Sequence, residues 1–192
     1  MTEAEVKELL LKHGAILEGH FLLTSGLHSG MYVEKFQVLQ YPKATEKLCE
    51  GFAENFKDEK IDVVIGPVTG GIILAHETAK HFGTRAIFAE RDNGRMTIKR
   101  GFEIQPGERV LIVEDIVTTG GSVMEVIDVV REWGGIVAGV AMLVDRSGGT
   151  VDFGVPAKAL LTLKIDTFTP ENCPLCKAGT PLVKRGSRKV PA

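Results

Sequence analysis

Residues 110–122 read VLIVEDIVTTGGS, an apolar run followed by a polar turn that leads into a helical pattern. The run ends in Glu114 and Asp115, and two threonines, two glycines and Ser122 follow. Glycines let backbone amides approach a ligand, hydroxyl groups donate hydrogen bonds, and a helix N-terminus carries partial positive charge. Residues 116–122 therefore predict a phosphate-binding turn. The two acids cannot also hold phosphate, so they predict sugar hydroxyls or Mg²⁺ beside it, and together these features indicate a sugar phosphate.

Similar apolar runs recur along the chain and indicate the fold class. Runs dense in valine and isoleucine that alternate with helical patterns are typical of a parallel sheet covered on both faces. We therefore predict an α/β domain with a doubly wound parallel sheet, in which ligands bind beyond the carboxyl ends of the strands. Strands are expected at residues 61–65, 85–89, 109–113 and 136–144.

The two ends of the chain differ from this pattern. Thr2 and Glu5 form a capping-box signature that begins a helix, and residues 20–32 predict two short strands joined by a loop. The basic stretch at residues 181–192 is expected to be a frayed terminus.

Composition excludes several classes of protein. The 192 residues are 44% hydrophobic with a net charge of -2, which fits one globular domain and no general attraction to nucleic acid or anionic membranes. The apolar runs are shorter than the roughly 20 residues that a membrane span needs, and the acidic N-terminus is unlike a signal peptide. Three cysteines do not suggest a disulfide framework, so a cytoplasmic location is expected.

Other phosphate motifs are absent from the sequence. It contains no G-x-x-x-x-G-K-[ST] motif, and no G-x-G-x-x-G follows a predicted strand. A merely tight turn would explain the glycines of residues 110–122 but not the two acids ahead of them.

Residues 91–101 form a polar segment with four basic side chains and one acid. Two interpretations remain open: a solvated surface loop, or a mobile lid that closes over an anionic substrate.

Residues 110–122 closely resemble the phosphoribosyl-pyrophosphate (PRPP) signature of type I phosphoribosyltransferases. The resemblance implies that the two acids contact the ribose hydroxyls and that the turn holds the 5-phosphate. It also implies that the turn GPVTGG at residues 66–71 binds pyrophosphate through backbone amides. The implied PRPP-binding set is Thr69, Gly70, Arg91, Glu114, Asp115, Ile116, Val117, Thr118, Thr119, Gly120, Gly121 and Ser122.

Residues 21–32, FLLTSGLHSGMY, are similar to the N-terminal element of orotate phosphoribosyltransferases, and Asp145-Arg146 resembles an Asp-Arg pair of that family. A guanidinium suits a planar carboxylate because it can donate two parallel hydrogen bonds. The implied orotate-binding set is Ser25, Tyr32, Thr118 and Arg146.

The resemblance implies a reaction and an assembly. PRPP and orotate would give orotidine 5′-monophosphate and pyrophosphate in pyrimidine (UMP) biosynthesis, with Mg²⁺ entering on PRPP rather than on protein side chains. The active unit would be a homodimer that shares its lids between chains. One domain is expected, with an N-terminal hood at residues 1–40, a core at 41–165 and a C-terminal segment at 166–192. Catalytic roles are expected for Asp115, Arg91, Lys99 and Arg100.

The sequence departs from the commoner family pattern at several positions. Thr24 and Gly70 stand where lysines are usual, and the lid lacks the K-x-x-K-x-H-G arrangement. The short lid and the CPLC motif at residues 173–176 look like a bacterial subgroup of the family. Two alternatives are a purine-base phosphoribosyltransferase, which would not need Arg146, and a non-catalytic PRPP-sensing regulator. A regulator should carry a nucleic-acid-binding element, and the near-neutral charge argues against one.

Cys173 and Cys176 have the spacing of zinc ligands but supply only half of a four-ligand site. Cys49 is distant in sequence and no H-x-x-x-H pair is present, so a non-metal turn is favoured over a dimer-shared or redox site. Among the histidines, His28 is the candidate for a ligand contact, whereas His20 and the others are expected to pack or face solvent.

Overall fold

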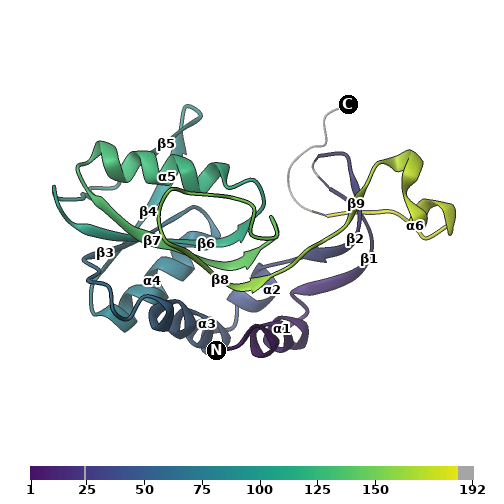
Figure 1. The fold of residues 1–192 in the computed structure, drawn as a ribbon, viewed down its shortest axis with the longest axis horizontal. Helices are drawn as coiled ribbons and strands as arrows, with labels where there is room; N and C mark the ends of the chain where they lie inside the picture. Colours follow the sequence, from purple (N-terminus) through teal and green to yellow (C-terminus); the bar gives the residue numbers. More distant parts are fainter. Residues whose placement is uncertain (24, 186–192) are drawn as a thin grey trace.

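A computed structural model describes residues 1–23 and 25–185 and contains two sheets (Figure 1). The main sheet has the strand order β5-β4-β3-β6-β7-β8, and the smaller sheet has the order β10-β1-β2-β9. The main sheet comprises β3 (Val63–Pro67), β4 (Arg85–Asp92), β5 (Arg95–Ile98), β6 (Arg109–Val117), β7 (Ile136–Asp145) and β8 (Ala157–Thr162). The smaller sheet comprises β1 (Ile16–Leu22), β2 (His28–Val33), β9 (Thr167–Phe168) and β10 (Val183–Lys184). The helices are α1 (Glu3–Lys12), α2 (Phe36–Leu39), α3 (Pro42–Asn55), α4 (Gly70–Phe82), α5 (Gly121–Glu132), a 3₁₀ turn at Pro170–Asn172, and α6 (Pro174–Lys177). None of the helices within these described ranges is long and apolar enough to cross a membrane.

The main sheet confirms the predicted fold class. All its neighbouring strands pair in parallel except β5, which runs antiparallel along β4 at the edge. From β3 the chain passes through α4 to β4 on one side, and from β6 it passes through α5 to β7 on the other side. The strand order therefore reverses between β3 and β6. In sheets of this kind, ligands bind at the carboxyl ends of the strands at such a reversal.

Two layers of helices cover the sheet, with α5 on one face and α3 and α4 on the other (Figure 1). Alternate residues of β3 face opposite sides, so Val63 and Ile65 join the core beneath α5 while Val64 joins the core beneath α4. The strand is buried throughout. This burial on both faces explains the unbroken apolar runs in the sequence.

Several strands differ from the predicted ones. β6 was expected to end at Val113 but continues to Val117, so Glu114 and Asp115 lie within the strand rather than beyond it. This added part of β6 remains paired with β7, where Glu114 lies opposite Met142 and Val117 opposite Asp145. The edge strands β5 and β8 were not predicted, because short edge strands carry a weak apolar signal.

Residues 91–98 belong to a β-hairpin, and residues 91–95 of this hairpin are exposed to solvent. β4 and β5 are joined by Asn93 and Gly94, whose φ values of 49° and 84° fit the type I′ turn that Asn-Gly favours. Met96 and Ile98 alternate with polar residues and are buried in the core beneath α5. Apolar packing of alternate residues therefore holds the hairpin against the sheet.

The smaller sheet combines the two ends of the chain (Figure 1). The predicted hairpin of β1 and β2 receives β9 along β2 and β10 along β1. Val183 and Lys184 lie opposite Phe21 and Leu22, so the tail does not fray at residue 181 as expected. Two expectations concern residues outside the described ranges: the departure from a family lysine at Thr24, and the fraying of residues 186–192. From here on, the hood means this sheet together with α6, which differs from the N-terminal hood of residues 1–40 expected from the sequence because β9 and β10 belong to it.

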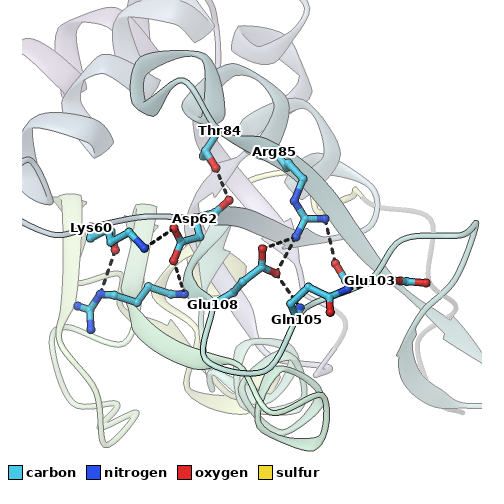
Figure 2. Close-up of polar contacts among 8 residues, drawn as sticks. Lys60, Asp62, Thr84, Arg85, Glu103, Gln105 and Glu108 are labelled. Atoms are coloured by element: carbon cyan, nitrogen blue, oxygen red, sulfur yellow. Dashed lines mark hydrogen bonds and ion pairs between the residues drawn. The ribbon is translucent and has the colours of Figure 1, made fainter.

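Charged side chains tie the amino ends of β3, β4 and β6 together (Figure 2). Arg85 donates to both carboxylate oxygens of Glu108, at 2.8 and 2.6 Å. Asp62 accepts a hydrogen bond from the backbone N–H of Arg109 at 3.0 Å and pairs with Lys60 at 2.9 Å. These two contacts lower the pKa of Asp62, the backbone hydrogen bond most strongly.

Candidate active site

Two buried acids occupy the carboxyl end of β6. Glu114 is 7% exposed and Asp115 is 3% exposed. Burial raises the pKa of Glu114 to about 8, with a further contribution from the charge of Asp115. Burial also raises the pKa of Asp115, although the ammonium group of Lys35 opposes this shift. In the free protein, this end of the sheet therefore holds carboxyl groups that are costly to ionise.

Lys35 contacts Asp115 and was not identified from the sequence. It lies between β2 and α2, and its Nζ is 2.9 Å from Oδ1 and 2.8 Å from Oδ2 of Asp115. The two residues are 80 positions apart in sequence, and a single lysine after a strand carries no signal that would connect it to a distant acid. The site thus has a lysine, although Gly70 stands where the family pattern has one.

Gly70 makes room for this ion pair. It is the first residue of α4, and a Cβ atom there would collide with Oδ2 of Asp115. The turn before it is also tight, since a Cβ on Gly66 would lie 2.6 Å from the carbonyl oxygen of Gly71. The Val68–Thr69 peptide bond is cis. Any side chain at position 70, including lysine, would displace the Asp115 carboxylate.

The predicted phosphate-binding turn connects β6 to α5. Gly120 has φ +77°, and a Cβ there would lie 2.7 Å from Val151 and 2.9 Å from Phe153. Glycine is therefore required at position 120 both by the backbone conformation and by packing. Val117, one of the residues predicted to bind PRPP, buries its side chain in the core beneath α5, so only its backbone remains available to a ligand.

Two cavities meet at the carboxyl edge of the sheet. The first, which we call the acid cavity, has a volume of about 380 Å³ and is lined by Glu114, Asp115, Ser122 and Arg91 among others. The second, the hood cavity, has a volume of about 660 Å³ and lies between the hood and the main sheet. Lys35 and Ile116 line both cavities. Ligands in the two cavities would therefore lie next to each other.

The hood cavity brings together the residues expected to bind orotate. Its walls include Ser25 and Tyr32 from the hood, Thr118 from the turn after β6, and Arg146 after β7. Arg185, near the described end of the chain, also lines it and was not identified from the sequence.

Arg146 is poorly satisfied in the free protein. Its Nε atom is buried and has no hydrogen-bond partner in the described part of the chain. Burial lowers the pKa of this arginine, yet a guanidinium remains charged at neutral pH. Buried polar groups are normally paired, so an unpartnered guanidinium in a cavity wall indicates a site for an anion. The adjacent Asp145 instead accepts hydrogen bonds from the backbone of Ser147 and Gly149, at 2.7 and 2.9 Å, and shapes the following loop.

The basic residues of the hairpin are paired with acids. Arg91 reaches the acid cavity and contacts Glu125 at 2.7 Å. The structure does not bring Lys99 and Arg100 to the wall of either cavity. Both are exposed and pair with acids on β4: Lys99 with Asp92 at 2.6 Å and Arg100 with Glu90 at 2.8 Å.

The expectation that His28 contacts a ligand in the substrate site is wrong, and His28 lies instead beside the CPLC motif. His28 is 4% exposed and its Nδ1 lies 3.2 Å from Sγ of Cys176, so it does not face the cavities described above. His20, from β1, is also buried and lies beside the same cysteines. The histidines come from neighbouring strands of a hairpin, so their spacing in sequence differs from that of an H-x-x-x-H pair and gives no sign that they lie beside the cysteines.

Comparisons with known proteins agree with this geometry. A family model described as the phosphoribosyl transferase domain matches residues 37–169. An orotate phosphoribosyltransferase of Caldicellulosiruptor bescii is 57% identical over 175 residues, which cover 91% of this chain and 92% of the relative. Another, from Desulforamulus reducens, is 51% identical over 190 residues, which cover 99% of this chain and 100% of the relative. The crystal structure of orotate phosphoribosyltransferase from Aeropyrum pernix superposes with a TM-score of 0.69 at 28% identity, covering 83% of this chain and 94% of that chain. The chain therefore belongs to the phosphoribosyltransferase family and, within it, to the orotate phosphoribosyltransferases.

Proposed function

We propose that the protein transfers phosphoribose from PRPP to N1 of orotate, with release of pyrophosphate, as a cytoplasmic enzyme of pyrimidine biosynthesis. The observation that carries this function is the pair of adjoining cavities, one lined by Glu114 and Asp115 and the other by Arg146. A sugar phosphate in the first and a planar carboxylate in the second would bring the two reacting atoms together at Lys35 and Ile116. Holding two reactants in this way contributes much of the rate enhancement in such a reaction.

PRPP is proposed to lie along the end of β6. Glu114 and Asp115 accept hydrogen bonds from the ribose hydroxyls, and the backbone and hydroxyl groups of residues 116–122 hold the 5-phosphate at the N-terminus of α5. Glu114 binds hydroxyls best when it is ionised, and its raised pKa makes PRPP binding pH-dependent. Lys35 is proposed to position Asp115 and to offset the negative charge between the two cavities.

The pyrophosphate is proposed to lie against the turn between β3 and α4. The backbone amides of Thr69 and Gly70 and the guanidinium of Arg91 are the donors available there. As the bond to the sugar breaks, the sugar becomes oxocarbenium-like and charge builds on the leaving group, which these donors stabilise.

The carboxylates fit Mg²⁺ that arrives with PRPP rather than a dedicated protein site. Asp115 is already paired with Lys35, and Glu114 is costly to ionise, so few free carboxylate oxygens face the acid cavity. Mg²⁺ commonly retains waters and binds through substrate phosphates. When bound, it supplies charge neutralisation for the pyrophosphate group.

Orotate is proposed to enter the hood cavity. Arg146 donates to the orotate carboxylate, which would give its buried Nε a partner, and Ser25, Tyr32 and Thr118 complete the contacts. The hairpin of β4 and β5 is proposed to act as the lid. Lys99 and Arg100 can act at a site only after leaving their acid partners, and the proposed homodimer would carry these side chains toward the neighbouring subunit.

The test is a base-selectivity assay. The loss of orotate absorbance is followed with PRPP and Mg²⁺, and formation of nucleotide is measured in parallel with adenine, xanthine and uracil. Of the four bases, we expect turnover only with orotate, and we expect this turnover to be lost when a chelator removes Mg²⁺. Turnover with a purine would assign the protein to the purine-base enzymes, and PRPP binding without turnover of any base would indicate a regulator.

A further inference from the structure

Four potential metal ligands converge in the hood, away from the two cavities. His20 comes from β1, His28 from β2, Cys173 from the residue before α6, and Cys176 from α6 itself. One ligand atom from each residue lies within 4.8 Å of all the others. Figure 1 shows α6 beside the strands of the hood. His20, His28 and Cys173 are at most 4% exposed, whereas Cys176 is exposed and leaves a path for an ion.

The spacing of these atoms is close to that of a tetrahedral zinc site. Nε2 of His20 lies 3.0 Å from Nδ1 of His28, 3.4 Å from Sγ of Cys173 and 3.7 Å from Sγ of Cys176. Nδ1 of His28 lies 3.2 Å from Sγ of Cys176. Zinc bonds of about 2.0–2.3 Å in tetrahedral geometry separate nitrogen and sulfur ligands by about 3.3–3.8 Å. The two distances from His20 to sulfur fall in this range, and the two distances that involve His28 are slightly shorter. Two thiolates and two imidazoles are a donor set that favours zinc over magnesium or calcium.

The hydrogen bonding of His20 supports a ligand role. Its Nδ1 lies 2.8 Å from the carbonyl oxygen of Thr180. A carbonyl can only accept, so Nδ1 carries the proton and Nε2 presents its lone pair to the sulfur atoms. Metal-binding histidines commonly have such a partner on the second nitrogen, which fixes both the tautomer and the ring orientation. A bulge in β1 between Glu18 and Phe21 places His20 beside the strand of His28.

A redox-active cysteine pair explains less of this arrangement. A disulfide between the cysteines would need no histidine. It would also leave unexplained why Nε2 of His20 and Nδ1 of His28 both lie within 3.7 Å of the sulfur of Cys176.

We propose that His20, His28, Cys173 and Cys176 bind one Zn²⁺, which fastens the C-terminal segment to the hood. Few other buried contacts hold this segment. Helix α6 has only 4 residues, none of them buried, and β10 consists of only 2 residues, both exposed. Structural zinc can contribute folding free energy directly to a small element of this kind.

The zinc would also act on the hood cavity. After Cys176 the chain turns back and pairs with β1 through Val183 and Lys184, which places Arg185 in the cavity wall. Removal of the metal should therefore raise the KM for orotate about tenfold, as expected for the loss of one charge-assisted hydrogen bond, with little change in the KM for PRPP. This consequence rests on the proposed function, whereas the metal site does not.

Metal content is the first measurement. The full chain is purified without chelators under reducing conditions, and metals are quantified by mass spectrometry. We expect about one zinc per chain in the wild type and in His76→Gln, a variant at an exposed histidine of α4. We expect Cys176→Ser and His28→Gln to lose most of the zinc. Full zinc content in both of these variants would overturn the proposal.

Cobalt binding tests the site without any substitution. Wild-type protein is stripped of metal, kept reduced and titrated with Co²⁺. The proposal requires the visible absorption of tetrahedral Co²⁺, thiolate-to-cobalt charge-transfer bands, and displacement of both signals by Zn²⁺. Their absence, or a Cys173–Cys176 disulfide in the protein as purified, would overturn the site. Limited proteolysis then tests whether zinc fastens the C-terminal segment to the hood. Removal of zinc should expose residues 170–185 to cleavage, and an unchanged cleavage pattern would overturn this role of the metal. An unchanged KM for orotate after zinc removal would overturn the link to Arg185 and leave the metal site intact.

Discussion

Charged side chains at the two edges of the main sheet differ in their burial and in whether they have partners. At the amino edge, Asp62 lies near the surface, is held by a backbone N–H and a lysine, and has a lowered pKa. At the carboxyl edge, Glu114 is buried and has a raised pKa, and the half-buried Arg146 has a buried Nε without a partner among the described residues. The amino edge is satisfied without a ligand, whereas the carboxyl edge is poorly satisfied until one arrives. Stability and binding are therefore assigned to opposite ends of the same strands.

The largest effect is expected at Asp115. Asp115→Asn removes the charge that pairs with Lys35 and would bind ribose, while the shape of the side chain is kept. Turnover should fall by at least about 100-fold, since charge-assisted hydrogen bonds contribute about 1.5–3 kcal/mol each. Initial rates with PRPP and orotate measure this loss, and circular dichroism verifies that the fold is intact. Near-normal turnover would remove Asp115 from the site.

Arg146→Ala tests the half-buried arginine of the carboxyl edge. The KM for orotate should rise about 10- to 100-fold through the loss of the carboxylate contact, and the KM for PRPP should change little. Steady-state kinetics with each substrate varied in turn separate the two constants. Arg131→Ala, an exposed arginine on α5, is the matched control. An unchanged KM for orotate would contradict the role given to Arg146.

Glu114→Gln tests the raised pKa. The carboxyl group of Glu114 ionises near its ordinary pKa of 4.5 when unfolded but near 8 when folded. The folded state therefore holds the proton more tightly, and the wild type loses stability as the pH rises from about 4.5 to about 8. The variant lacks this loss, so its stability advantage should grow by about 3 kcal/mol between pH 5.5 and pH 8. Urea unfolding at pH 5.5 and at pH 8 measures the difference, and equal differences at the two pH values would contradict the buried, protonated state.

The smallest effect is expected at the amino edge. Arg85→Ala breaks the exposed pair with Glu108 and should cost about 1 kcal/mol or less in the free energy of unfolding, with kcat unchanged. The cost should shrink further in high salt. A loss of turnover comparable to that of Arg146→Ala would show that the two edges do not have separate roles.

Much of the candidate site could be predicted because it lies in continuous stretches of chain. Glu114, Asp115 and the turn after them adjoin one another in sequence, and Thr69 and Gly70 belong to a turn after the neighbouring strand. Ser25, Tyr32 and Arg146 were identified through a family resemblance, and the structure places them around one cavity. The hairpin of residues 91–98 was missed although Asn93-Gly94 is a strong hairpin signal. The strand β8 was missed because a short edge strand has little apolar pattern of its own.

The sequence by itself determined the α/β class, the position of the turn proposed to bind phosphate and the residues that lead into it. Each of these follows from local periodicity, glycine conformation and turn chemistry, which act over a few neighbouring residues. Only the tertiary structure decided that Lys35 pairs with Asp115, that Arg185 reaches the hood cavity, and that two histidines lie beside Cys173 and Cys176. Those contacts join residues 80 to 156 positions apart, and they depend on strand order and on the packing of the hood, which no local pattern encodes.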